Sequence, residues 1–163
     1  MRLTRFLRIA AVALILAPVA APALAGPAET AFLERLVGTW RGKGKITGAE
    51  AGNLTCRLTL KPSRERLNFN GRCAYSGGSG AQSFSGSIRY NEAKGVFESS
   101  SNGRTVAGKK SGSNLVFTTT QKDMRGTMTS TLTLSPSTLK MQFKVIETRS
   151  GDTSQGSIPF SKS

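Results

Sequence analysis

Alternation of apolar and polar residues in short segments dominates the chain after Gly38 and constrains the fold more than any other feature. Residues 54–61, for example, place Leu, Cys, Leu and Leu at every second position, with Thr, Arg, Thr and Lys between them. Successive side chains of a β-strand point to opposite faces, so this period of two indicates half-buried antiparallel strands. We predict about ten strands, at residues 40–46, 54–61, 67–75, 84–90, 96–100, 105–110, 115–120, 128–134, 139–145 and 158–160.

Short segments of turn-forming residues separate the predicted strands. The strongest hairpin signal is Asn102-Gly103, and the other turns are predicted at residues 62–65, 77–80, 91–95, 111–113, 135–137 and 150–152. Links this short favour pairing between consecutive strands, and closure of such a meander removes its exposed edges. The sequence therefore predicts an all-β fold, a single antiparallel up-and-down β-barrel of about 8–10 strands.

One helix is expected before the barrel, over residues 27–37. Phe32, Leu33, Leu36 and Val37 recur at helical spacing. Proline at residue 27 suits the first turn of a helix, and Gly38 follows its last apolar residue.

The first 25 residues have the three parts of a secretory signal peptide. Three arginines occur within the first eight residues, residues 9–21 are uncharged and mostly apolar, and Ala23-Leu24-Ala25 is a small-x-small cleavage site. A membrane anchor is the alternative, but spanning a bilayer takes about 20 apolar residues and Pro18 interrupts this run. We predict a signal peptide at 1–25, one domain at 26–163, a periplasmic or secreted location and no transmembrane segment after cleavage.

The two cysteines, Cys56 and Cys73, test the strand assignment. A hairpin centred on Arg64 and Glu65 places them directly opposite each other on one face. Opposed residues of an antiparallel pair lie about 4.5–5.5 Å apart, within reach of a disulfide. A two-thiolate metal site lacks further ligands, and the chain contains no histidine. We therefore predict a structural disulfide.

The net charge favours an anionic partner. The whole chain carries 23 basic and 9 acidic residues, and removal of the three signal-peptide arginines leaves a net charge of +11. After export, an anionic envelope surface is a better match than nucleic acid. The alternative is a solvated basic surface, because the basic residues are scattered along the chain.

The residue content excludes several catalytic mechanisms. Without histidine the chain forms no Ser-His-Asp triad, no Cys-His pair and no histidine-bearing metal site. The nine acidic residues form no obvious inward-facing pair on one strand. We predict a protein that is not an enzyme and that uses no cofactor and no metal.

The predicted inner face is rich in aromatic residues. A cavity lined by apolar and aromatic groups is the usual form of a small-molecule site, whereas plain core packing is the alternative. The sequence therefore favours an exported, non-enzymatic barrel that binds a small apolar or amphipathic ligand. The candidate ligand-binding residues are Phe69, Tyr75, Phe84, Tyr90, Phe117 and Phe143.

The segment Leu36-Val37-Gly38-Thr39-Trp40 resembles the Gly-x-Trp entry of calycin-type β-barrels, which include lipocalins and bacterial lipocalin-like proteins. The resemblance implies that the tryptophan closes the bottom of the barrel, so that Gly38 and Trp40 are structural. The count of ten strands is also similar to that of haem-binding barrels related to this group. Those barrels use a histidine as iron ligand, and the lack of histidine here argues against haem.

A weaker resemblance links the chain to periplasmic inhibitors of secreted metalloproteases, which are disulfide-bearing barrels with a Gly-x-Trp strand. It implies inhibition by an inserted N-terminal segment, here residues 26–30. The predicted helix lies where that segment should be flexible. The alternative functions are thus a protein-binding module such as a protease inhibitor, or a basic envelope-associated structural protein.

Overall fold

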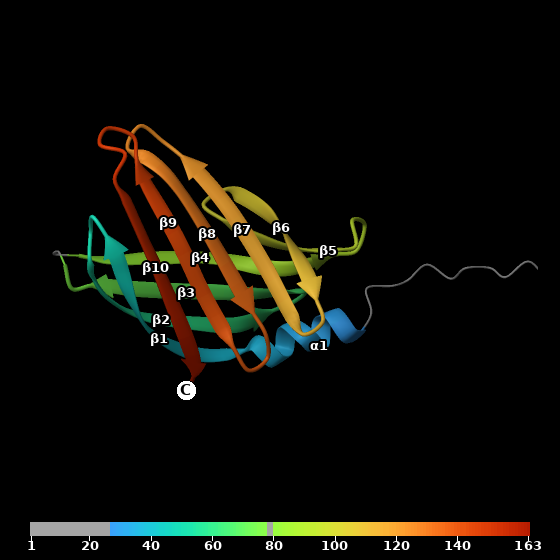
Figure 1. Ribbon diagram of the computed structural model, residues 1–163. Helices are drawn as coiled ribbons and strands as arrows, with labels where there is room; N and C mark the ends of the chain where they lie inside the picture. Colours follow the sequence, from blue (N-terminus) through green and yellow to red (C-terminus); the bar gives the residue numbers. More distant parts are fainter. Residues whose placement is uncertain (1–26, 78–79) are drawn as a thin grey trace, which may run out of the picture.

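The computed structural model describes residues 27–77 and 80–163 (Figure 1). The predicted signal peptide lies outside the described residues. One helix, α1 (Pro27–Leu36), precedes ten strands. The strands are β1 (Gly38–Gly48), β2 (Gly52–Ser63), β3 (Arg66–Tyr75), β4 (Ala81–Asn91), β5 (Val96–Ser101), β6 (Arg104–Ser111), β7 (Asn114–Lys122), β8 (Gly126–Leu134), β9 (Leu139–Glu147) and β10 (Thr153–Lys162).

The strands form a closed barrel in which every strand pairs with its neighbours in sequence. All pairs are antiparallel, and β1 pairs with β10 to complete the ring. The predicted all-β, up-and-down barrel with a short N-terminal helix is confirmed, with ten strands. Within the described residues, no helix is long and apolar enough to cross a membrane.

Helix α1 lies at one end of the barrel (Figure 1), which we call the closed end. Phe32, Leu33 and Leu36 on the helix are buried. The ring of Phe32 lies 5.6 Å from the ring of Phe97 on β5, measured between centroids. The apolar residues whose spacing predicted the helix therefore form the helix face that packs against the barrel. The helix ends at Leu36, one residue earlier than predicted.

The register of β2 and β3 is the predicted one. Cys56 is paired with Cys73, and the two are joined by a disulfide with a Cα–Cα distance of 4.1 Å. The turn itself is shorter than expected, because β2 continues through Ser63 and leaves Arg64 and Glu65 between the strands. Arg64 adopts a positive φ of 52°, which allows so tight a reversal.

The core is concentrated at the closed end. The largest fully buried side chains there come from the helix, from β1 and from the strand ends that meet them. Toward the other end, which we call the open end, β5, β7 and β8 turn serine and threonine side chains to the inside. Small polar side chains fill less space than the leucines and aromatics of the core, so this half of the barrel is hollow.

The wall of the barrel is incomplete between β6 and β7. Only the last three residues of β6 pair with β7, from Lys109 to Ser111. The two strands diverge from their shared turn at the closed end toward the open end (Figure 1). The β5–β6 hairpin therefore lacks strand pairing with β7 over the part nearer the open end.

Candidate functional site

The barrel encloses a cavity of about 850 Å³, a size typical of small-molecule sites. Strands β2 to β10 all contribute to its lining. The apolar lining residues are Leu58, Leu60, Phe69, Phe84, Ile88, Val106, Phe117, Leu132, Leu134, Leu139, Met141 and Phe160. Most are leucine or phenylalanine, so the inner part of the cavity offers an apolar surface.

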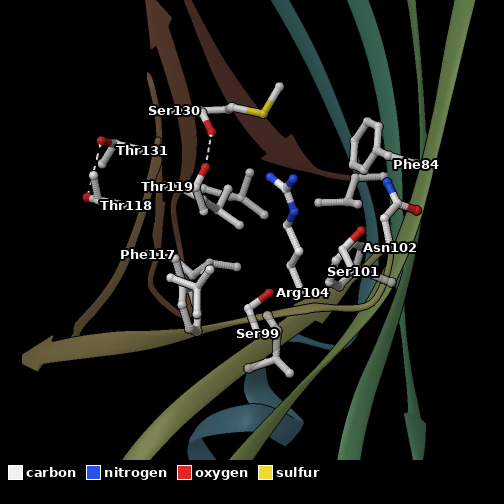
Figure 2. A pocket seen from close by; sticks show the side chains of 18 of the residues that line it. Phe84, Ser99, Ser101, Asn102, Arg104, Phe117, Thr118, Thr119, Ser130 and Thr131 are labelled. Carbon is white, nitrogen blue, oxygen red and sulfur yellow. Dashed lines mark hydrogen bonds between the residues drawn. The ribbon is translucent and has the colours of Figure 1, made fainter. Parts of the chain in front are cut away.

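Polar side chains from the β5–β6 hairpin, β7 and β8 line the cavity toward the open end. Across β7 and β8, the hydroxyl oxygens of Thr119 and Ser130 lie 2.7 Å apart in a hydrogen bond (Figure 2). Thr118 and Thr131, which point the other way, form a similar pair at 3.4 Å. The β5–β6 hairpin supplies Ser99, Ser101, Asn102 and Arg104. The cavity is therefore amphipathic, with an apolar interior and a polar opening.

Arg104 carries the charge of this cavity. Its guanidinium group points inward, between the wall that carries Thr119 and Ser130 and the wall that carries Phe84 and Asn102 (Figure 2). The side chain is exposed to solvent. Among the described lining residues it is the one charged side chain. The ion pairs found within the described part of the chain both involve Glu98, so they leave Arg104 without an acidic partner.

The structure divides the six aromatic residues of the predicted site into two groups. Phe69, Phe84 and Phe117 line the cavity. The other three are not among its lining residues, and they lie at three separate places in the barrel. They are Tyr75, Tyr90 and Phe143.

Each of these three side chains packs elsewhere. At the open end, the Tyr75 hydroxyl donates a hydrogen bond to the carbonyl oxygen of Ala51 at 3.1 Å. Tyr90 lies at the closed end, where its ring meets Phe97 edge-on at 5.1 Å. The ring of Phe143 lies over Gly156, where a side chain would collide with it. Three of the six predicted aromatic rings therefore line the cavity.

Arg104 is the main residue that sequence reasoning missed. The predicted strand begins at Thr105, which leaves Arg104 between the Asn102-Gly103 turn and the strand. A usable signal was present, because Arg104, Val106 and Gly108 follow one another at every second position. Extending the strand by one residue places the arginine on the inner face.

Glu98 is a buried carboxylate on the outer face of β5, away from the cavity. Its side chain is 4% exposed. Its oxygens accept hydrogen bonds from Lys94 and Asn91, both at 3.0 Å, and from two nitrogens of Arg89, at 2.9 and 3.2 Å. These hydrogen bonds lower the pKa of Glu98 from 4.5 to about 2, and the bond from Lys94 has the largest effect. An ionised carboxylate with four donors around it stabilises the β4–β5 hairpin and is unsuited to general acid catalysis.

Three arginines form a row on the outer face of β1, β2 and β3. Arg41 is paired with Arg57, and Arg57 is paired with Arg72, and all three are exposed. Like charges directly opposite each other on a sheet are destabilising. This arginine row therefore concentrates positive charge at a cost to stability, and no described acidic residue forms an ion pair with it.

Gly38 and Trp40 lie where the barrel is closed. Trp40 is fully buried, and its indole nitrogen donates a hydrogen bond to the carbonyl oxygen of Leu36 at 3.0 Å. The ammonium group of Lys162 on β10 lies 5.6 Å from the centre of the indole ring. Because ten antiparallel strands close at this end beneath a helix and enclose a cavity toward the other, the chain has the fold of a calycin-type β-barrel.

The solved structures that share this fold include the following two. One is CPES, an S-type phycobiliprotein lyase from Guillardia theta, with a TM-score of 0.57 and 10% identity over 80% of this chain and 90% of that chain. The other is Rv2717c from M. tuberculosis, with a TM-score of 0.58 and 9% identity over 85% of this chain and 98% of that chain. The sequence matches no family model and no curated protein sequence. At this level of identity the likeness is one of fold.

Proposed function

We propose that this protein is an exported, non-enzymatic barrel that binds a small apolar or amphipathic ligand in its cavity. The observation that carries the proposal is the cavity of about 850 Å³ with an apolar interior and a polar opening. The signal-peptide pattern of residues 1–25 and the Cys56–Cys73 disulfide support a periplasmic or secreted location.

The non-enzymatic part of this proposal rests on the residues and not on the fold. One of the similar structures described above is named a lyase, so this fold is compatible with an enzyme. The chain contains no histidine, and the buried carboxylate of Glu98 faces away from the cavity. Binding without catalysis is the function that these residues favour.

Blocking the cavity tests the proposal. The variant Leu132→Trp adds an indole to the wall of the cavity. A ligand forced against this indole is overpacked, which in a packed apolar interior costs about 1–3 kcal/mol. We expect this substitution to weaken binding of the neutral fluorescent probe N-phenyl-1-naphthylamine by about ten- to a hundredfold. A fluorescence titration of the wild type and the variant measures this.

Thr133→Trp is the matched control, because Thr133 is the next residue of β8 and points to the opposite face. This variant is expected to bind the probe as the wild type does. Failure of the wild type to bind the probe, or equal loss in both variants, would contradict a ligand site in the cavity.

The N-terminal segment gives little support to the protease-inhibitor alternative. Residues 27–30 of the segment that would insert belong to helix α1, which is held against the barrel by Phe32, Leu33 and Leu36. An inserting segment has to leave its own barrel, and three buried apolar side chains oppose that.

A second candidate function, contact with an anionic envelope surface, is favoured by the arginine row. A basic residue near a membrane with anionic lipids contributes about 1 kcal/mol to binding. The double variant Arg57→Gln, Arg72→Gln is therefore expected to bind vesicles of phosphatidylglycerol and phosphatidylcholine about thirtyfold more weakly than the wild type. Vesicle co-sedimentation at low ionic strength measures the difference.

Lys122→Gln with Arg125→Gln is the control, since it removes two positive charges near the β7–β8 turn, away from the row. Binding of the wild type is expected to fall as sodium chloride is added. A salt-independent interaction, or an equal loss in both double variants, would argue against this surface.

A further inference from the structure

The polar opening of the cavity holds an unpaired positive charge. The guanidinium group of Arg104 points into the cavity (Figure 2), and the described residues provide it with no acidic partner. The exposed arginines of the outer row lie on the outside of the barrel, whereas Arg104 points into its interior cavity. A cation in this position favours ligands that carry an anionic group.

The number of charges limits the anion. Arg104 is the one charged side chain among the described residues that line the cavity. A singly charged head group is neutralised by one guanidinium, whereas a doubly charged phosphate leaves one negative charge without a partner in the cavity. A guanidinium also presents a planar pair of N–H donors that matches the two oxygens of a carboxylate.

The neighbouring hydroxyl groups add hydrogen-bond donors. Thr119 and Ser130 share one hydrogen bond at 2.7 Å, and such a pair of hydroxyls contains two hydrogens. One hydrogen forms the bond between them and the other is free to donate to a third group. Ser99 lines the same cavity from the β5–β6 hairpin, whereas the Ser101 hydroxyl already donates to the carbonyl oxygen of Ser85 at 2.6 Å. The hydrogens left on the Thr119–Ser130 pair and on Ser99 suit a carboxylate, which accepts hydrogen bonds at both oxygens.

The opposite part of the cavity determines the rest of the ligand. Leu58, Leu60 and Phe117 are buried at its inner wall, and the remaining apolar lining residues continue that surface. A hydrocarbon chain or apolar ring gains about 25 cal/mol per Å² of surface that it buries there. A ligand that complements both the apolar interior and the polar opening of the cavity has an apolar body and a polar head at the opening.

We propose that the cavity binds an amphipathic molecule with a single carboxylate, and that Arg104 binds this carboxylate while the apolar body lies toward the closed end. The inference rests on the proposed function, since it requires the cavity to be a ligand site. It adds the charge and the orientation of the ligand, neither of which follows from the size of the cavity.

The test compares two fluorescent probes that differ in head group alone, cis-parinaric acid and its methyl ester. A hydrogen bond with a charged partner contributes about 1.5–3 kcal/mol, so the wild type is expected to bind the acid about ten- to a hundredfold more tightly than the ester. Arg104→Gln is expected to bind the two probes equally and to retain the wild-type affinity for the ester. Arg104→Lys, which keeps the charge but loses the planar fork, is expected to keep part of the preference.

Arg149→Gln is the matched control, because Arg149 is an exposed arginine in the β9–β10 turn at the same end of the barrel. It should retain the full preference for the acid, which separates a local effect from the overall positive charge. Equal affinity of the wild type for acid and ester, or an undiminished preference in Arg104→Gln, would overturn the assignment of Arg104 while leaving the ligand site intact. Binding of neither probe would overturn the ligand site as well.

Discussion

Replacing Trp40 by alanine is expected to lower the free energy of unfolding by about 3–5 kcal/mol. Trp40 is fully buried at the closed end, between the helix and the ammonium group of Lys162. Its loss leaves a cavity and removes the hydrogen-bond donor to Leu36, whose carbonyl ends helix α1. Urea unfolding followed by far-UV circular dichroism measures the effect, because the variant has no tryptophan fluorescence.

Trp40→Phe separates packing from hydrogen bonding. It retains most of the buried ring but lacks the indole donor, so the expected loss is smaller, about 1–3 kcal/mol. Equal stability of Trp40→Ala and the wild type would show that this residue is not what closes the barrel. That result would also remove the structural meaning of the Gly-x-Trp pattern in this chain.

The fold was predictable because two independent patterns agreed. Alternation assigned Cys56 and Cys73 to one face, and the turn residues Arg64 and Glu65 placed them opposite each other. A slip of the register by one residue turns every side chain of a strand to the other face, so a disulfide at the expected positions verifies the whole hairpin. The sequence could not show that β6 separates from β7, because strand pairing over part of a length leaves no mark on the alternation.

The candidate site was only partly predictable from the sequence. Alternation indicates which face of a strand a residue occupies, but it does not indicate how far along the barrel axis that residue lies. Tyr75 and Tyr90 lie on strands whose inner faces were assigned correctly, but they are at opposite ends of the barrel. Around β5 and β6 the inner face carries Ser99, Ser101 and Arg104, so polar residues occur on both faces and the alternation disappears. The polar opening therefore has no hydrophobic pattern of its own, and only the spacing from Val106 and Gly108 indicates the face on which Arg104 lies.

Removing the disulfide is expected to lower the free energy of unfolding by about 3 kcal/mol. Cys56 and Cys73 are separated by 17 residues, and the bond restricts the unfolded chain by closing a loop of that length. The double variant Cys56→Ala, Cys73→Ala abolishes the bond and leaves no free thiol, since the chain has two cysteines. Urea unfolding of this variant beside the oxidised wild type measures the loss.

Reduction provides the control, because dithiothreitol acts on the wild type through the disulfide and leaves the double variant unchanged. The reduced wild type is expected to approach the stability of the variant, apart from the small difference in packing between cysteine and alanine. Alkylation of protein recovered from the envelope and from the cytoplasm, followed by mass spectrometry, tests the link to export. Cysteines joined in the disulfide, which do not react, are expected in protein from the envelope, and free thiols, which are alkylated, in protein from the cytoplasm. Equal stability of the oxidised and reduced wild type would mean that strand pairing alone holds β2 to β3. The bond would then mark the compartment of the protein without stabilising its fold.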